Sequence, residues 1–273
     1  MIDSHVHFWN FDPVRDNWIT ADMEIIRHDF MPNDILKTYQ QVGIEGCIAV
    51  QANQSETETQ FLLDLAKENA LIKGIVGWTD LNADNLQERL NYWKDFDLIK
   101  GWRHVLQAEQ DDFILDDNFA DGVKLLNEFN YTYDLLCYHT QLAAIIKLVD
   151  KLPNQPLVLD HCGKPDVKFQ DLKAYDEHIK ILAQNPNVSC KISGLLTEAD
   201  WHKWSEREVF NCFDIVFNHF GIDRIMYGSD WPVVLVSRPY KTWFNLVQNY
   251  LLGFSEEEKT KVLEGNAKRF YKI

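Results

Sequence analysis

Eight short apolar segments alternate with longer stretches of helical period along the whole chain, and this alternation limits the fold more than any other feature. The apolar segments predict strands at residues 2–8, 45–52, 73–79, 98–105, 132–138, 156–161, 188–193 and 224–229. The helical period lies near residues 32–42, 56–69, 84–94, 117–129, 140–151, 171–184, 206–219 and 240–252. Eight strands, each followed by a helix, are typical of a (β/α)8 TIM barrel, an α/β fold.

The length of the chain fits a single barrel. Its 273 residues contain no Pro- or Ser-rich linker, no repeat and no low-complexity tract, and a barrel of this kind usually has about 250 residues. We therefore expect one domain over residues 1–273, in which the tail 255–273 adds a further helix that closes under the barrel. A doubly wound open sheet is the alternative, but no GxGxxG turn follows the first strand.

Charge and composition limit the partners. The formal net charge is −15, so the surface repels nucleic acid and anionic membranes, whereas a small-molecule substrate stays compatible with it. No apolar run approaches the about 18 residues of a membrane span, and no signal peptide is evident. The five cysteines form no CxxC pair, which favours free thiols and a cytoplasmic location. The oligomeric state stays open.

Four polar residues at predicted strand ends form the candidate site. His5 and His7 are two apart on the first strand, so their side chains share one face. His161 ends the sixth strand and Asp230 follows the eighth. The carboxyl ends of all eight strands meet at one mouth of a barrel, where catalytic groups gather. We therefore expect the three imidazoles and the carboxylate to converge there.

Several longer motifs carry a family resemblance over nearly the whole chain. They are "DSHVHFW" at 3–9, "GWTDL" at 77–81, "GWRHVLQ" at 101–107, "VLDHCGKP" at 158–165, "CKISGL" at 190–195, "YGSDWPV" at 227–233 and "GNAKRFY" at 265–271. In this order they resemble the lactonase-type branch of the amidohydrolase superfamily. That branch includes fucono- and rhamnonolactone hydrolases, pyrone dicarboxylate hydrolases and muconolactone hydrolases. Its fold is a (β/α)8 barrel, in agreement with the alternation of segments.

The resemblance implies roles for the candidate residues. Asp230 matches the aspartate that deprotonates the attacking water, and a carboxylate beside imidazoles can serve as such a base. His5, His7, His161 and Asp230 would either hold one divalent metal, zinc by ligand chemistry, or act on the carbonyl without a metal. Both designs stay open. A binuclear site is not expected, because the fourth strand ends in Arg103 and His104 rather than in a lysine.

Further residues are expected around this centre. Arg103 offers a fixed cation to the lactone oxygen and is a catalytic candidate. The candidates for substrate contact are Gln51, Trp78, Asp80, Lys191 and Trp231, with Trp9 and Trp18 as further aromatic walls. Lys191 has a second interpretation, a contact with Asp160. His104 and Asp160 are expected to point away from the mouth, since each neighbours a residue that faces it.

The sequence thus favours a hydrolase that opens a lactone ring, with a sugar aldonolactone as substrate and Asp230 as general base. The alternative is a metal-dependent decarboxylase of an unsaturated carboxylic acid, because such barrels share the HxH motif, the later histidine and the strand-8 aspartate. A barrel that only binds sugar acids is a third interpretation, but a binding protein has no use for a base beside the histidines.

Overall fold

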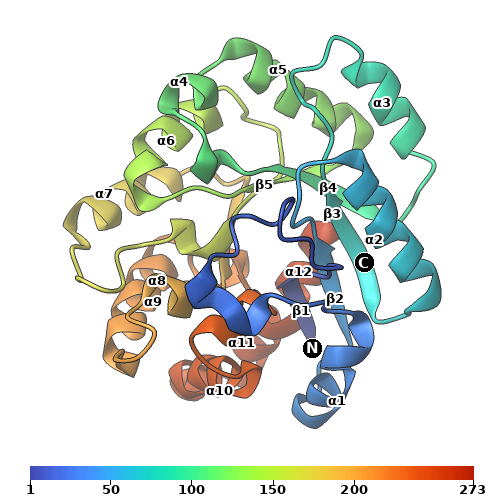
Figure 1. Ribbon diagram of the computed structural model, residues 1–273. Coiled ribbons are helices and arrows are strands. Elements are labelled where there is room, and N and C mark those ends of the chain that lie inside the picture. Colours follow the sequence, from blue (N-terminus) through green and yellow to red (C-terminus); the bar gives the residue numbers. More distant parts are fainter.

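The computed structural model, which describes all 273 residues, is a nearly closed barrel of eight parallel strands in sequential order (Figure 1). The strands are β1 (Ile2–Val6), β2 (Gly46–Val50), β3 (Ile72–Gly77), β4 (Ile99–His104), β5 (Thr132–Leu135), β6 (Leu157–Leu159), β7 (Val188–Ile192) and β8 (Ile225–Tyr227). The predicted fold class is therefore confirmed. None of the helices combines the length and the apolar character needed to cross a membrane.

The helices form the outer layer around the strands (Figure 1). They are α1 (Pro32–Val42), α2 (Glu56–Glu68), α3 (Leu86–Trp93), α4 (Asp111–Ile114), α5 (Asp117–Leu125), α6 (Leu142–Asp150), α7 (Lys173–Leu182), α8 (Leu195–Glu198), α9 (Glu206–Phe220), α10 (Tyr240–Tyr250), α11 (Glu256–Thr260) and α12 (Asn266–Tyr271). Ser55, Ser205 and Ser255 cap α2, α9 and α11, each accepting a backbone N–H of the first turn. These caps satisfy amide donors that the helices leave free.

The segment after β8 closes the barrel against β1. The Asp230 amide donates to the His5 carbonyl at 2.9 Å, and the His7 amide donates to the Trp231 carbonyl at 2.7 Å. The buried Asp3 carboxylate accepts the Ser229 amide at 2.8 Å. These bonds place the HxH motif and the SDW motif side by side.

All eight strands end earlier than the apolar pattern predicts, and at β6 and β8 the early end changes the conformation of site residues. The predicted strand 156–161 ends at Leu159, and the predicted strand 224–229 ends at Tyr227. His161 and Asp230, with φ of 54° and 59°, adopt the left-handed conformation just beyond these ends. That conformation is uncommon outside glycine and breaks the alternation of side chains along a strand.

The tail closes the base of the barrel, as expected. Ala267 and Tyr271 of α12 pack with Ile2, Ile48, Val50, Val76, Val158 and Met226 from the strands. The Asn266 side-chain amide donates to the carbonyls of Ile222 and Ile225 at 2.8 and 2.7 Å. The barrel interior is therefore sealed at the end opposite to the mouth.

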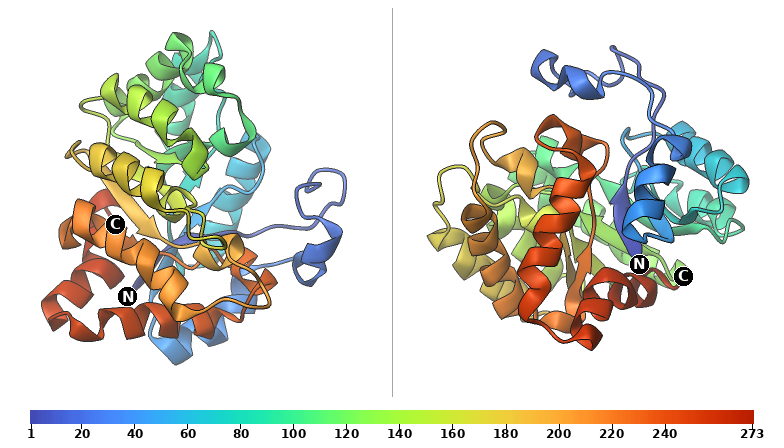
Figure 2. Two further views of the ribbon diagram at one scale, coloured as in Figure 1. Left: turned by 90° about the vertical axis from the view of Figure 1, so that its left-hand side faces the viewer. Right: turned by 90° about the horizontal axis from the view of Figure 1, so that it is seen from below.

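Figure 2 shows the loop between β1 and α1 standing out from the body of the barrel. A bridge between Trp9 and Phe30 joins the two ends of this loop. Trp18 and Ile25 are exposed on it, whereas Ile19 and Ile26 are buried. The loop is thus anchored at its base and presents side chains near the mouth.

Candidate active site

Three imidazoles and one carboxylate converge at the mouth. Asp230 Oδ1 lies 3.4 Å from His7 Nε2 and 3.9 Å from the Nε2 atoms of both His5 and His161. The Nε2 atoms of His5 and His7 are 3.2 Å apart. All four residues are at least nine-tenths buried. The sequence-predicted quartet is therefore one cluster in the structure.

The Nδ1 atom of each histidine has a polar partner on the side away from Asp230. His7 Nδ1 donates to the Val50 carbonyl at 2.8 Å, and His161 Nδ1 lies 2.8 Å from Ser193 Oγ. His5 Nδ1 lies 3.3 Å from the Asp160 carboxylate. Partners of this kind fix the orientation and tautomer of a catalytic or metal-binding imidazole. The three Nε2 atoms are in this way directed toward Asp230.

Two glycines of the motifs make room for these rings. A Cβ on Gly194 would lie 2.6 Å from His161 Nδ1, and Gly194 has φ of +66°. A Cβ on Gly228 would lie 2.9 Å from the His5 Cβ. Only glycine allows such close approach, which explains why the SGL and YGSD motifs carry it at these positions.

Burial and charge set the protonation of the cluster. Burial lowers the pKa of His161 to about 4 and lowers the pKa of His5 well below its ordinary value. Burial opposes the charge on Asp230, but His161, His7 and His5 outweigh it and hold the pKa of that carboxyl below its ordinary value. Near neutral pH the site therefore holds an ionised carboxylate and neutral imidazoles at His5 and His161.

The donor set fits one divalent cation. One potential ligand atom from each of His5, His161 and Asp230 lies within 4.8 Å of the others. His7 Nε2 carries a lone pair, because its Nδ1 donates to a carbonyl, and it faces His5 Nε2 at 3.2 Å. His5 Nε2 also lies 3.3 Å from the donor Arg103. Two acceptors at this distance repel unless a proton or cation lies between them, and imidazole with carboxylate suits zinc.

Arg103 crosses the barrel below the cluster. Its Nη1 donates to Asp160 Oδ2 at 3.0 Å, and its Nη2 donates to the Gln51 carbonyl. Gln51 in turn donates to the Arg103 carbonyl at 3.2 Å. Gln51 is fully buried and holds Arg103 in place, so the structure does not bring it to the open cavity.

The expectation that Asp160 points outward was wrong. Asp160 is fully buried and lies 2.9 Å from Lys191 Nζ, 3.0 Å from Arg103 and 3.3 Å from His5. Strand β6 ends at Leu159, so the alternation used for that expectation does not extend to Asp160 and His161. Two roles were expected for Lys191, contact with the substrate and contact with Asp160. The structure shows the contact with Asp160, below the cluster, and Lys191 does not line the cavity.

A cavity of about 370 Å³ opens above the cluster. His7, Arg103, His161 and Asp230 contribute to its lining. Its other polar and aromatic lining residues come from the loops: Arg15, Asn17, Trp18, Asn53, Gln54, Gln107 and Lys164. Among these residues, sequence reasoning gave a role only to Trp18. Gln107 and Lys164 lie within the quoted motifs GWRHVLQ and VLDHCGKP, and that position was the signal that could have found them.

Like Gln51 and Lys191, the other three expected contact residues lie outside this cavity. Asp80 is exposed and accepts the Asn82 amide at 3.0 Å, as a turn residue does. The backbone of Trp78 bonds to Thr59. Trp231 is buried against Phe8 and Phe30. Buried Trp9 likewise packs on Phe30. As expected, His104 faces the helical layer, where it stacks on Phe113 and pairs with Glu109 at 2.9 Å.

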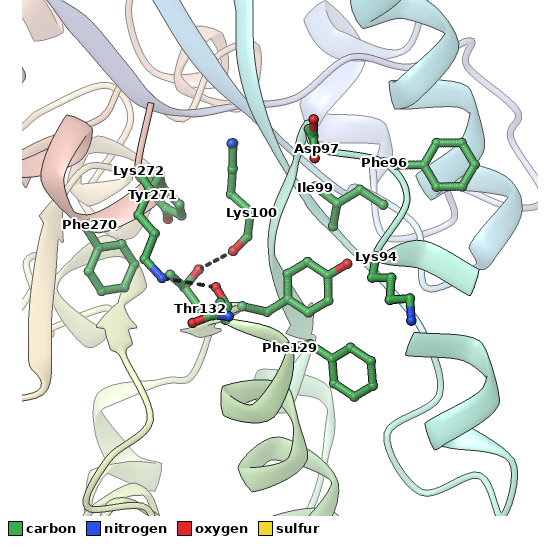
Figure 3. Close-up of a pocket in the computed structure, with 12 residues that line it drawn as sticks. Lys94, Phe96, Asp97, Ile99, Lys100, Phe129, Thr132, Phe270, Tyr271 and Lys272 are labelled. Carbon is green, nitrogen blue, oxygen red and sulfur yellow. Dashed lines mark hydrogen bonds between the residues drawn. The ribbon is translucent and has the colours of Figure 1, made fainter. Parts of the chain in front are cut away.

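A smaller hollow of about 160 Å³ lies at the sealed base (Figure 3). Lys94, Lys100 and Lys272 line it together with aromatic residues, and Thr132 Oγ1 donates to the Lys100 carbonyl at 3.3 Å. It contains no histidine. The mouth is therefore the candidate active site.

A cluster of imidazoles and a carboxylate at the carboxyl ends of parallel strands, around a cavity in the mouth, is the arrangement expected of a barrel enzyme. The chain is 37% identical over 284 residues to L-fucono-1,5-lactonase of Burkholderia multivorans, covering 100% of this chain and 96% of that protein. It is 24% identical over 204 residues to L-rhamnono-gamma-lactonase of Scheffersomyces stipitis, covering 66% and 60%.

A crystal structure of a Burkholderia multivorans amidohydrolase with bound zinc matches the fold with a TM-score of 0.96 at 37% identity, covering 100% of this chain and 99% of that one. The family model described as amidohydrolase matches residues 2–273. The chain belongs to the amidohydrolase family. The expected resemblance to its lactonase-type branch is confirmed by these relatives.

Proposed function

We propose that this enzyme hydrolyses the ester bond of a sugar aldonolactone, with Asp230 as the general base. The observation that carries the proposal is the ionised Asp230 carboxylate, which lies among three imidazoles and lines an open cavity of about 370 Å³. The names of the relatives, L-fucono-1,5-lactonase and L-rhamnono-gamma-lactonase, support this reaction class.

Zinc is the proposed cofactor, and a zinc-bound relative supports it. His5, His161 and Asp230 would hold the ion with His7 beside them, and its chemistry there is Lewis acidity toward the lactone carbonyl. A base with a low pKa removes a proton from water effectively only where the water is acidified. Because the neighbouring histidines hold the pKa of Asp230 below its ordinary value, Asp230 would depend as a base on water acidified in this way.

The remaining steps use side chains of the chain itself. Asp230 accepts the proton of the attacking water as the water adds to the carbonyl carbon. Arg103 lines the cavity and its Nε has no hydrogen-bond partner in the protein, so it can stabilise the negative charge that develops on the carbonyl oxygen. The tethered alkoxide then leaves and takes the proton back from Asp230.

The cavity lining favours a polyhydroxylated ring. The side-chain amides of Asn17, Asn53, Gln54 and Gln107 offer donors and acceptors for hydroxyl groups. Gln107 Oε1 is buried without a partner and is a ready acceptor. Trp18 offers an exposed indole face, the surface against which sugar rings pack.

The test is a panel of five- and six-membered aldonolactones, followed by proton release with a pH indicator, with and without chelator and against a no-enzyme control. Asp230→Asn is expected to lower kcat by about 10²–10⁴-fold while KM stays similar, since the amide is nearly isosteric. Asp80→Asn is the matched control, because Asp80 is exposed and outside the cavity. Release of carbon dioxide from an unsaturated carboxylic acid, with no lactone hydrolysed above background, would replace the proposal by the decarboxylase.

We further propose a reducing, cytoplasmic setting and a small-molecule substrate, with neither nucleic acid nor a membrane as a partner. All five cysteines are free and buried, as a chain that needs no disulfide would have them.

A further inference from the structure

Four charged side chains fill the barrel below the catalytic histidines. Lys191 Nζ lies 2.5 Å from Asp134 Oδ2 and 2.9 Å from Asp160 Oδ1, and Asp160 Oδ2 accepts from Arg103 at 3.0 Å. Asp134, Asp160 and Lys191 are fully buried and Arg103 is 3% exposed. The two cations and two carboxylates balance in charge. We call this set the axial column.

Tyr271 contacts the axial column from the base. Its hydroxyl donates to Asp134 at 2.9 Å, and Lys191 Nζ lies 5.4 Å from the centroid of its ring, within cation–π distance. Tyr271 belongs to α12, at the end of the chain, and lines the basal hollow (Figure 3). The last helix is thus linked to the active site through two side chains, Asp134 and Lys191.

The upper end of the axial column contacts His5. Lys191 Nζ lies 3.2 Å from His5 Nδ1, and Asp160 Oδ1 lies 3.3 Å from the same nitrogen. Lysine and arginine are only donors, but the protons of Lys191 have two nearer acceptors, Asp134 at 2.5 Å and Asp160 at 2.9 Å. Arg103, 3.3 Å from His5 Nε2, is therefore the contact that requires a lone pair on a ring nitrogen of His5. The proton of His5 is then on Nδ1 and faces the Asp160 carboxylate, which Lys191 and Arg103 hold from two sides.

Stability alone does not explain such a column. The interior of a barrel of this type is ordinarily filled by branched apolar side chains. Buried ion pairs seldom stabilise a fold more than apolar residues of similar volume would. Here the charged layer lies directly under a catalytic imidazole and contacts its ring.

We propose that Tyr271, Asp134 and Lys191 are positioning residues, which hold Asp160 so that His5 keeps its Nδ1–H tautomer and presents Nε2 to Asp230 and a cation. The effect on turnover rests on the proposed lactonase function. The effects on the His5 tautomer and on zinc binding do not depend on it.

The first experiment compares Tyr271→Phe with Tyr250→Phe. Tyr250 donates to Asp214 at 3.0 Å in the outer helical layer, so this control also loses a Tyr–Asp hydrogen bond but has no link to the site. Tyr271→Phe is expected to weaken zinc affinity, measured by competition with a chelator, about 3–10-fold. This is less than the about 10–100-fold for losing a direct partner of a metal ligand, because Tyr271 acts through Asp134 and Lys191. kcat should fall with KM unchanged. Tyr250→Phe should leave all three quantities unchanged.

The second experiment removes one charge of each sign. Asp134→Asn with Lys191→Met keeps the balance of the axial column and leaves Asp160 with Arg103. Zinc affinity is expected to fall about 10–100-fold, and ¹⁵N NMR of metal-free protein is expected to show His5 partly in the Nε2–H form, whereas the wild type shows Nδ1–H.

The proposal is overturned if wild-type His5 carries its proton on Nε2, or if both variants lose only thermal stability while tautomer and zinc affinity stay as in the wild type. If the wild type hydrolyses no lactone, the proposed function fails. The His5 tautomer, measured in metal-free protein, then still shows whether the axial column positions His5 or only contributes to the stability of the fold.

Discussion

Replacing Gly194 by alanine is expected to impair catalysis by moving His161. The new Cβ would lie 2.6 Å from His161 Nδ1 and 2.7 Å from its Cγ. Carbon–nitrogen contacts below 3.0 Å do not persist, so the ring must shift by several tenths of an ångström and loses its contact with Ser193. A displacement of about 1 Å in a catalytic group can cost about 100-fold in rate. We expect a loss of kcat of about that size.

The backbone adds a separate, measurable cost. Alanine in the left-handed region costs about 1–2 kcal/mol relative to glycine. Gly43, the residue that ends α1, is also in the left-handed region, with φ of 80° and ψ of 26°, and the nearest atom to a Cβ there would be Met1 Cε at 3.4 Å. Gly43→Ala therefore carries a similar backbone cost without the clash. Urea denaturation should therefore show both variants destabilised by at least about 1 kcal/mol. Only Gly194→Ala should lose activity and zinc affinity under conditions in which both are folded. Full kcat in Gly194→Ala, or an equal loss in Gly43→Ala, would refute the reasoning.

Two further substitutions test the stability of the protein and the binding of its substrate. Burial raises the pKa of Glu58 from 4.5 to about 7, so between these values the folded state binds more protons than the unfolded state, and its stability falls as pH rises. Glu58→Gln should raise the free energy of unfolding by about 2–3 kcal/mol at pH 8 and leave it nearly unchanged at pH 4; equal urea curves at pH 8 would contradict this. Trp18→Ala should raise KM about tenfold with kcat little changed, the loss expected from one aromatic contact. Ile25→Ala, on the same loop but outside the cavity, should not change KM.

The periodic part of the fold was accessible from the sequence. Strands buried on both faces read as apolar runs, and amphipathic helices read as a 3.6-residue period, so their alternation identifies a barrel. His5 and His7 were also predictable as a pair. His7 lies one residue beyond β1, but its backbone bond to Trp231 continues the strand pairing there. Once the strands are in order, their ends share one mouth, which brings His161 and Asp230 to the same place.

The parts of the site that depart from regular strand or helix geometry could not be predicted from the sequence. Asp160 lies past the last paired residue of β6, where the chain turns into the left-handed region at His161, so a strand-based rule assigns it to the wrong face. The lining residues Asn17 and Gln54 lie on loops, whose paths depend on tertiary contacts rather than on local period. Tyr271 is distant in sequence from Asp134, and only the packing of α12 against the base joins them.

The closure of the barrel has a consequence for the synthesis of the protein. His5 leaves the ribosome more than 200 residues before its neighbours Asp230 and Trp231, and earlier still than Tyr271 below them. Until these late segments emerge, β1 lacks its neighbour on one side and no nascent chain can assemble the cluster. Contacts of such large sequence separation form late and slowly in folding. Premature termination anywhere before the final turns therefore yields an inactive product rather than a weakened enzyme.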